Sequence, residues 1–592
     1  MTTLRRIAIL TSLVGGIYLV DDKLNARTLQ RNALTAWNGL CIGLDYKINF
    51  RPGKGDKIEE LHERVANRIL NICRSNGGLY IKLGQSIGVQ SSILPTAYQR
   101  AFKQLYDDAP AVEFEQVVKI FKEDFNCHPD DIFDDFERNA IASASVAQVH
   151  QAKLKDGTLV AVKVQKPDIR KQMYWDLLAY KALMYLYEYI FDLPLTWSAN
   201  YTEKHIRQEV DFENEGRNAE KTNKHLEMEK SLRNKAYIPK IFWDYTSKRV
   251  LTAEWIDGVK ITDQEGIRRY GYQVKDVIKT TIDIFSYQIF CSGFVHADPH
   301  PGNVFVRPNP NNSKNFQIVL IDHGLYVEES IVFRHQYCLL WKSLFIMDTE
   351  TINQICKEWG IAESDLFISA QIMKPYKSQT AIHVSSTKSV TLQDAYEMQM
   401  AIKDNIKKFL TDTELIPREL IFIGRNMNIV RSLNRELGSP VNRINLMGNW
   451  AVKGLGADWS NWGGNAKTFE NNENNNLLSI HSNNNINNEI SKLNDKKVYQ
   501  TIIIYKNNLS LFFEKIGFVL KSRFNYWFFK ATLLMISLGL YLTQTKEVIE
   551  SWIRNGGNAR NARGFEELLD DQMKSSLEEN FGIILDQRFF EG

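Results

Sequence analysis

The feature that most constrains this chain is a short polar loop between two apolar runs, Phe294-Val-His-Ala-Asp-Pro-His-Pro-Gly-Asn-Val-Phe-Val306. The loop places Asp298 and Asn303 five residues apart. A second acid, Asp322, follows directly after the strand-like run Gln317-Ile-Val-Leu-Ile321. Phosphoryl transfer requires such a set, because charge spread over the phosphate oxygens must be met by a divalent metal and a positioned base. These three side chains are therefore candidates for one catalytic site.

Protein kinases hold a catalytic Asp, a metal-binding Asn and a second metal-binding Asp in this order and spacing. They also use a strand lysine, and Lys163 lies in the apolar run Val160-Ala-Val-Lys-Val164. Burial of a lysine is costly unless its charge is paired. In a kinase-like site Lys163 would hold the α and β phosphates of a nucleotide and pair with a helix glutamate. A lone lysine on an edge strand is the alternative, but the acids downstream favour the nucleotide-binding role.

Candidate partners for Lys163 lie in the acidic run Gln208-Glu-Val-Asp-Phe-Glu-Asn-Glu-Gly-Arg-Asn218. Helical spacing allows two pairs of acids to share a face: Glu209 with Glu213, or Asp211 with Glu215. A solvated acidic face is the alternative for such a run. Val210 and Phe212 indicate partial burial, so we expect one or two of these acids to point inward.

A kinase has a glycine-rich loop before its strand lysine, whereas this chain has Ala140-Ile-Ala-Ser-Ala-Ser-Val-Ala-Gln-Val-His150. Small residues still let the backbone approach a phosphate, although Ala cannot adopt positive φ as cheaply as Gly. An ordinary strand turn is the alternative. Asp156-Gly157 predicts a turn between the alternating runs 148–153 and 159–165, which is typical of a β-hairpin. The position of the run, one hairpin before Lys163, favours a nucleotide loop. Its candidate binding residues are Ala142, Ser143, Ala144, Ser145 and Val149.

The loop at 294–306 also allows a metal-site interpretation, with His296, Asp298 and His300 at a two-residue stride. Three ligands from one extended segment rarely converge without distant help, and the prolines between them stiffen the run. We therefore do not expect a zinc site. His296 and His323 are expected to be structural histidines in the core of the loop.

Size and composition set the outer limits. A chain of 592 residues exceeds one domain, and its net charge of +3 gives no whole-chain field that would indicate a nucleic-acid partner. The six cysteines are scattered without a CxxC pair, which argues against a disulfide framework and a zinc ribbon.

Two apolar runs suggest contact with a membrane. Residues 1–20 contain Arg5 and Arg6, no acid, and an apolar run from Ile7 to Val20. As a helix this run is about 21 Å long, shorter than a hydrocarbon core of roughly 30 Å. We expect a mitochondrial targeting or anchor segment; a secretory signal and a buried helix are the alternatives. The run 526–542 has one lysine beside an aromatic cluster, which fits an interfacial belt or a buried amphipathic helix equally well.

Three further motifs identify a family. With Lys163 and the three downstream residues in place, the chain resembles the UbiB/ADCK family of atypical kinases, the aarF-domain-containing proteins. Gly77-Gly-Leu-Tyr-Ile-Lys-Leu-Gly-Gln85 matches the KxGQ signature of that family through Lys82, Gly84 and Gln85. Residues 142–145 stand where the family has its alanine-rich loop, with Ser143 replacing an alanine. Glu209-Val-Asp211 matches the ExD motif.

The resemblance covers residues 55 to 445, and the texture of residues 211–220 and 320–326 is similar to the mitochondrial branch that contains human ADCK one. It implies an α+β fold: a bilobal kinase-like structure with a small mixed N-lobe, a helical C-lobe and an N-terminal helical extension that covers the active site. The expected parts of the chain are an anchor segment (1–45), the KxGQ extension (55–125), the N-lobe (131–258), the C-lobe (259–455), an Asn-rich insert (465–495) and a helical tail (496–592).

The resemblance also implies a role for each site residue. Lys163 and Asp298 would be catalytic, with Glu215 pairing Lys163 at the phosphates. Asn303 and Asp322 would bind Mg²⁺. Lys82 and Gln85, reaching Glu209 and Asp211, would gate the site, and Gly84 belongs to the same gating motif.

The implied ligands are ATP or ADP, Mg²⁺ and a lipid or isoprenoid, at the inner mitochondrial membrane. The implied activity is that of an atypical kinase or ATPase in coenzyme Q or lipid homeostasis. A nucleotide-gated protein that binds and shuttles lipid, a conventional serine/threonine kinase and a catalytically silent scaffold are the alternatives.

Overall fold

The computed structural model describes residues 25–50, 57–89, 96–105, 111–192, 195–361 and 417–455, with short pieces at 16, 18–22, 364–365, 367–368, 531, 534–535, 545 and 566. The Asn-rich insert and most of the apolar runs 7–20 and 526–542 lie outside these residues. Among the helices that are described, none is both long and apolar enough to cross a membrane.

A five-stranded antiparallel sheet forms the small lobe. Its strands run in the order β1-β3-β4-β6, with β2 paired to β3. The predicted hairpin is confirmed: β3 and β4 pair antiparallel around a turn in which Gly157 has φ +87°. The elements of this lobe are α6 (Phe114–Phe125), α7 (Pro129–Ile132), β1 (Phe133–Phe136), β2 (Ala142–Ser143), β3 (Ala147–Leu154), β4 (Leu159–Gln165) and β6 (Val250–Glu254).

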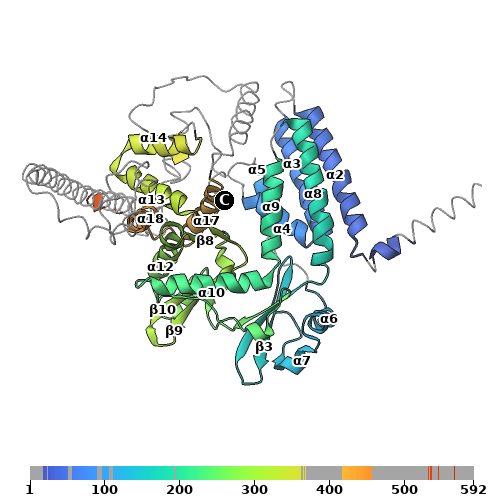
Figure 1. Ribbon diagram of the computed structural model, residues 1–592, viewed down its shortest axis with the longest axis horizontal. Coiled ribbons are helices and arrows are strands. Elements are labelled where there is room, and N and C mark those ends of the chain that lie inside the picture. The colour runs from blue at the N-terminus through green and yellow to red at the C-terminus, as the bar shows by residue number, and fades with distance from the viewer. Residues whose placement is uncertain are drawn as a thin grey trace, which may run out of the picture.

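Helix α6 covers one face of this sheet (Figure 1). Val117, Ile120 and Phe121 of α6 are buried in one cluster with Val160 and Val162 of β4. Alternate residues of β4 point to opposite faces, so Lys163, between Val162 and Val164, projects from the other side. The apolar packing of α6 therefore fixes the face on which the lysine is presented.

Beside the lobes stands a separate layer of helices (Figure 1). It has its own buried cluster, built around Leu61, Leu70, Leu83 and Phe102 and joined by Leu177. The members of the layer are α2 (Thr28–Asn49), α3 (Ile58–Asn76), α4 (Leu79–Val89), α5 (Thr96–Lys103), α8 (Ile169–Phe191) and α9 (Thr196–Glu209). Helices that come before strands β1–β4 in the sequence (α2–α5) and helices that come after them (α8 and α9) thus pack into one helical layer.

Helix α10 (Phe212–Met228) links this layer to the large lobe, running from the side of β3 to the side of α12 (Figure 1). Helix α9 ends at Glu209 and α10 begins at Phe212, so the helical structure is interrupted between them. Asp211 is the N-cap of α10, and its side chain accepts a hydrogen bond from Asn214 N at 3.5 Å. An acidic side chain at this position satisfies a free backbone donor.

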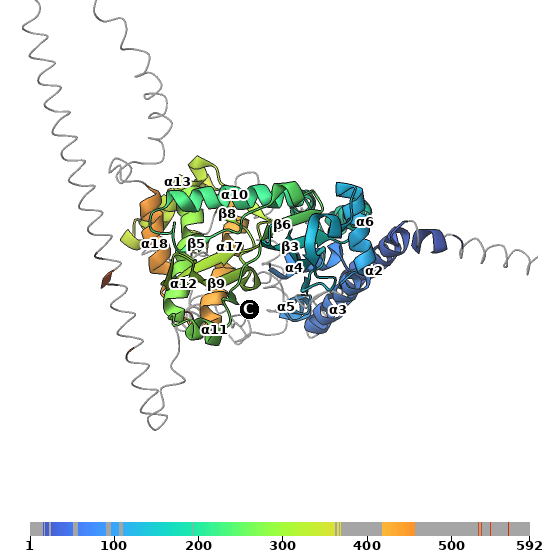
Figure 2. The same cartoon turned by 90° about the horizontal axis from the view of Figure 1, so that it is seen from below.

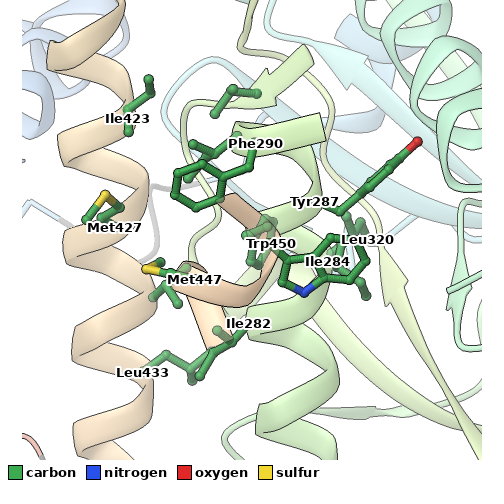
Figure 3. Packing of buried hydrophobic residues seen from close by; sticks show 14 of the residues in the cluster. Ile282, Ile284, Tyr287, Phe290, Leu320, Ile423, Met427, Leu433, Met447 and Trp450 are labelled. Atoms are coloured by element: carbon green, nitrogen blue, oxygen red, sulfur yellow. The ribbon is translucent and has the colours of Figure 1, made fainter. Parts of the chain in front are cut away.

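The large lobe packs helices around one core (Figure 3). Phe290 stacks on Tyr337 with centroids 5.6 Å apart, and Met427 and Met447 are buried in the same cluster. The helices are α11 (Gln264–Arg269), α12 (Val274–Tyr287), a π-helical turn (Gln288–Ser292), α13 (Ile331–Ile346), α14 (Thr349–Glu358), α17 (Glu419–Glu436) and α18 (Arg443–Gly454).

After residue 258 the described chain is mainly helical, as expected, but the large lobe also contains strands. A four-stranded sheet of order β5-β10-β9-β7 and a β8–β11 pair lie within this lobe. Four of the strands (β5, β7, β8 and β11) have only two or three residues, so their patterns are weak in the sequence, whereas β10 contains most of the strand-like run 317–321 that the sequence indicated. They are β5 (Ala236–Tyr237), β7 (Val259–Lys260), β8 (Phe294–His296), β9 (Val304–Asn309), β10 (Asn312–Leu320) and β11 (Tyr326–Glu328).

Candidate functional site

Lys163 of β4 and Glu215 of α10 form an ion pair at the junction of the lobes. The lysine Nζ lies 2.7 Å from Glu215 Oε1 and 2.9 Å from Oε2, and 3.4 Å from Asp322 Oδ2. The Glu215 side chain is only 2% exposed, whereas that of Lys163 is 22% exposed. The cation is thus oriented by a buried carboxylate and faces the second acid of the motif.

Lys163 stabilises the charged forms of both acids, although burial and the nearby Asp322 raise the pKa of Glu215 to about 7. Burial would lower the pKa of Lys163, but the carboxylates of Asp322 and Glu215 outweigh it and raise the pKa. Burial likewise opposes ionisation of Asp322, but Lys163 and the Gly324 backbone N–H hold its pKa well below the usual range. Lys163 and Asp322 are therefore charged at neutral pH.

Asp322 and Asn303 are neighbours because their strands pair. Strands β9 and β10 are antiparallel, with Leu320 opposite Val304, and Ile321 N donates to Asn303 O at 3.1 Å. Asp322 Oδ1 accepts a hydrogen bond from Gly324 N at 3.0 Å. A carboxylate and an amide oxygen on adjacent chain ends fit Mg²⁺, which takes few protein ligands and completes its shell with water and phosphate oxygens.

Asp298 lies between two cations. Arg425 of α17 approaches its Oδ1 at 3.1 Å. Burial would raise the pKa of Asp298, but the charges of Arg425 and Lys82 more than offset this and lower it. A carboxylate held ionised and in a fixed place can orient an acceptor hydroxyl and take its proton.

The KxGQ residues lie on α4, which brings Lys82 into the site. Lys82 Nζ forms an ion pair with Glu209 Oε1, and the charges of Asp298 and Asp322 also act on it. The structure thus brings Lys82 and Glu209 together, as the gating interpretation expects. The side chain of Gln85 donates to Leu105 O at 2.9 Å.

Gly84 has a packing role on the same helix. A Cβ at this position would meet Leu105 Cδ1 and would lie 2.9 Å from Cys73 Sγ. Glycine therefore allows α4 to approach α3 closely, which sets the depth at which Lys82 enters the site.

The break removes one of the two face-sharing pairs proposed for the acidic run: Glu209 is the last residue of α9 and α10 begins at Phe212, so Glu209 and Glu213 have no helical spacing. Asp211 and Glu215 remain one helical turn apart, because Glu215 N donates to Asp211 O at 3.1 Å. Glu213 instead pairs with Arg217 at 2.9 Å. The break separates the acids by function: Glu209 reaches Lys82, and Glu215 reaches Lys163.

The alanine-rich segment forms a tight hairpin above the lysine. Ala142 pairs with Val149 and Ser143 with Gln148, and Ala144 N donates to Ala147 O at 2.8 Å. Val149 is also directly opposite Lys163 in the β3–β4 register. Small side chains at the turn leave its backbone open to a phosphate.

Within the described chain, Ser143 Oγ is buried without a hydrogen-bond partner. A buried hydroxyl of this kind loses free energy unless it finds a partner. A ligand group at the hairpin would supply one. Ser145, the other serine of the turn, is 7% exposed.

The two loop histidines are structural. His296 Nδ1 accepts from Asp298 N at 3.1 Å, and its ring stacks on Tyr326 at 4.8 Å. His323 Nε2 lies 3.0 Å from Leu320 O, and burial holds the pKa of this histidine far below its usual range. His300 Nδ1 accepts from Gly302 N at 3.2 Å and caps a short 3₁₀ turn. In the described residues no three His, Cys, Asp or Glu side chains form a metal-binding group.

Three residues of the site were not predicted from the sequence. Arg425 contacts Asp298, and Asn426 Nδ2 donates to His296 O at 2.7 Å. Both lie on α17, far along the chain, and no local motif marks them. Gly324 ends the Asp322 motif, and a Cβ there would lie 3.4 Å from both Asp322 Oδ1 and Glu209 Cγ. The sequence offered one indication for Gly324, namely its position at the end of the motif Ile321-Asp-His-Gly324.

Comparison with known proteins gives one consistent relationship. Residues 104–356 match the ABC1 atypical kinase-like domain. An ABC1 family protein of Schizosaccharomyces pombe is 40% identical over 74% of this chain and 81% of its own length. AarF domain-containing kinase 1 of Drosophila melanogaster is 35% identical over 64% of this chain and 72% of its own.

A solved Mycobacterium tuberculosis protein in complex with erythromycin is 18% identical, with 62% of this chain and 99% of that chain covered and a TM-score of 0.35. The sequence relationships carry the assignment. With its lysine–glutamate pair, paired acids and helical extension, the chain belongs to the ABC1/AarF (UbiB/ADCK) family of atypical kinases and is a phosphotransferase-like enzyme with an α+β, kinase-like fold.

Proposed function

We propose that the protein is an ATP- and Mg²⁺-dependent kinase or ATPase whose acceptor is a small lipid-like molecule, with a role in mitochondrial coenzyme Q or lipid homeostasis. The observation that carries the proposal is the position of Lys82. It lies within the field of Asp298 and Asp322 and pairs with Glu209. Helix α4 of the extension therefore lies beside the two acids, and in our proposal it occupies the side of Asp298 where a peptide acceptor would otherwise lie.

Each residue of the proposed active site then has a defined role. Lys163, oriented by Glu215, would hold the α and β phosphates, and the β2–β3 hairpin would cover them. Asn303 and Asp322 would hold Mg²⁺, which supplies charge neutralisation at the phosphate oxygens. Asp298 would orient the acceptor hydroxyl and take its proton, while the closed site excludes water.

The family and the partly closed acceptor side support a small acceptor. Two parts of the proposal come from the sequence: the basic, acid-free start of the chain supports a mitochondrial location, and the apolar runs support a position at the inner membrane. A hydroxyl-bearing isoprenoid or lipid headgroup would reach the site from the bilayer side.

The first test is Asp322→Asn. Loss of one carboxylate charge should abolish the Mg²⁺-dependent rise in melting temperature that ADP or ATP produces. Asp276→Asn, on the exposed surface of α12, is the matched control. An unchanged melting-temperature shift in Asp322→Asn would remove the site assignment.

The second test concerns the acceptor. Steady-state ATPase is measured with and without phenolic and phospholipid headgroup analogues, and products are searched by mass spectrometry for a phosphorylated lipid. Stimulation or a lipid phosphate supports the proposal. Phosphorylation of a serine or threonine peptide, with no response to lipid analogues, would favour a conventional protein kinase.

A second function is favoured by the Lys82–Glu209 pair, which joins the extension to the end of α9. If nucleotide changes this contact, the protein could bind and release a lipid with each turnover instead of phosphorylating it. Lipid release that follows ATP hydrolysis, with no phosphorylated lipid, would support this function. A scaffold without catalysis would show neither turnover nor Mg²⁺-dependent nucleotide binding.

A further inference from the structure

The outermost helix, α2, exposes an apolar face. All of its residues are described, and Lys47 is the one polar side chain among those that are exposed. Trp37 is 66% exposed and Leu44 is 60% exposed. The exposed apolar residues are Leu29, Ala33, Leu34, Ala36, Trp37, Leu40, Leu44 and Ile48. Most of them recur every three or four positions, so they form a stripe along one side of the helix.

Helix α8 has a second stripe of the same kind. After Arg170 and Lys171 in its first turn, every exposed residue of this fully described helix is apolar or aromatic. Tyr189 is 89% exposed and Trp175 is 48% exposed. The stripe consists of Tyr174, Trp175, Leu178, Ala182, Tyr185 and Tyr189. Isolated exposed apolar residues are ordinary, whereas two aligned stripes are not.

The two helices are parallel neighbours. Arg31, near the start of α2, forms a buried ion pair with Asp176, near the start of α8. Further along, a Cβ at Gly43 would lie 3.3 Å from the Tyr187 ring, and Tyr187 donates to Gly39 O at 2.8 Å. Figures 1 and 2 both place α2 at the outer edge of the molecule.

One edge of each stripe borders the line of contact between the helices. Leu40 and Leu44 directly follow the contact glycines of α2, and on α8 Trp175 and Ala182 directly precede Asp176 and Leu183, which contact α2. In parallel helices these four residues lie on the same side of the contact line. A helix of 22 residues is about 33 Å long. Together the stripes therefore form one elongated apolar surface, which we call the α2–α8 surface.

We propose that the α2–α8 surface lies on a lipid bilayer, with its tryptophans and tyrosines at the level of the headgroups. Aromatic side chains with one polar atom favour that level. Trp37, Trp175, Tyr174, Tyr185 and Tyr189 supply five exposed aromatic side chains along the two stripes. A protein partner of ordinary composition would meet polar and charged groups as well, and within these two stripes such groups are confined to the helix ends.

The start of the chain supports this occupant. The apolar run that begins at Ile7 leads into Tyr18, Leu19 and Val20, which are about half exposed or more. Asp21 then accepts hydrogen bonds from Leu29 N and Gln30 N in the first turn of α2. The described end of the run, Tyr18–Val20, therefore lies close to the start of α2, and a run that enters a bilayer would bring the α2–α8 surface to the same bilayer.

Docking of this surface would also fix the orientation of the active site relative to the bilayer. Helix α8 packs against α4, and α4 carries Lys82 into the site. A lipid acceptor would then approach the helices that stand over Asp298. The docking proposal itself requires no phosphoryl transfer, so nucleotide binding is measured separately in every variant.

The first experiment uses the full chain with vesicles of phosphatidylcholine and phosphatidylethanolamine that contain a photoactivatable phosphatidylcholine. After illumination, lipid adducts are mapped by mass spectrometry. The proposal expects adducts on peptides of α2 and α8. Adducts confined to residues 1–20 and 526–542, or to the two lobes, would overturn it.

The second experiment measures flotation of the Trp37→Glu/Trp175→Glu variant with the same vesicles. Two charges on an apolar contact should weaken vesicle binding by about tenfold or more. Ile331→Glu/Val332→Glu is the matched control, because both residues are 67% exposed on α13. Equal flotation of the Trp variant and the wild type would refute docking. So would a wild-type oligomer that fails to float and becomes monomeric in the Trp variant.

Discussion

Arg425 of α17 approaches the carboxylate of Asp298 at 3.1 Å and joins the C-terminal part of the large lobe to the catalytic loop. Its neighbour on the same helix, Asn426, holds His296 O at 2.7 Å. Two consecutive residues of α17 thus fix both ends of the segment His296–Asp298. The position of the catalytic acid depends on a helix that lies far away in the sequence.

The first prediction concerns this contact. Arg425→Ala should lower turnover by about 10- to 100-fold, because a misplaced catalytic acid loses that much without loss of substrate binding. Nucleotide affinity should stay nearly unchanged, since Lys163 and Glu215 are untouched. Arg425→Lys should restore part of the rate, and Arg418→Ala, at the exposed start of the helix, should have no effect. An equal loss of nucleotide affinity and turnover would contradict a positioning role.

Lys82 should compete with Mg²⁺ for the acids of the site. Its charge acts on Asp298 and Asp322, so Lys82→Met should tighten Mg²⁺ binding in the presence of ADP by roughly five- to tenfold, equivalent to about 1 kcal/mol of repulsion. Isothermal titration measures the affinity directly. Lys47→Met, on the exposed side of α2, is the control. Weaker Mg²⁺ binding in Lys82→Met would mean that the lysine helps to hold the nucleotide itself.

Gly84 should tolerate no side chain. Gly84→Ala would place a methyl group against Leu105 and Cys73 and should destabilise the extension by about 1–3 kcal/mol through overpacking. Gly424→Ala is the matched control. Among the residues that the structure describes, no atom outside the local helix lies within 4 Å of its Cβ position, in the interior of α17, so that change should stabilise by up to about 1 kcal/mol. Chemical denaturation of both variants measures the change in the free energy of unfolding, which should fall for Gly84→Ala and rise for Gly424→Ala.

Stability should fall in mild acid through His62 of α3. The ring is buried with its Nδ1 2.8 Å from the Tyr46 hydroxyl, and burial lowers the pKa of His62 from 6.5 to about 4. Between these pH values the unfolded chain binds a proton that the folded chain does not. Stability present above pH 6.5 is therefore lost as the pH falls to 4, by up to about 3 kcal/mol.

Melting curves across this pH range test that expectation. His62→Phe keeps the ring packed but cannot take up a proton, so its stability should depend less steeply on pH than that of the wild type. Identical pH profiles for the two proteins would show that another group controls the acid response.

Local sequence patterns predicted the parts of the fold that depend on near neighbours. The Asp156-Gly157 turn between alternating runs was sufficient for the β3–β4 hairpin, because side chains of period two and a turn that needs positive φ define a register. The order of Lys163, Asp298 and Asp322 was likewise sufficient for a kinase-like arrangement. The structure bears out the expected contact of Lys163 with Glu215.

Local sequence patterns gave wrong or no predictions in two situations: where an acidic run was taken as one continuous helix, and where the contacting residue lies far away in the sequence. The break after Glu209 could not be seen in an acidic run that looks helical throughout, and it changed which acids share a site. The shortest strands of the large lobe, β5, β7, β8 and β11, could not be predicted, because strands of two or three residues leave little periodicity to detect.

The sequence by itself determined which chemical groups this protein has: a strand lysine, two acids, an amide and the KxGQ helix, in an order that specifies a kinase-like site. Tertiary structure decided which of them meet. Lys82 faces Glu209 because Gly84 lets α4 sink against its neighbours, and Asp298 is charged because α17 brings Arg425 to it. Such contacts depend on packing between distant segments, which short-range spacing in a chain does not encode.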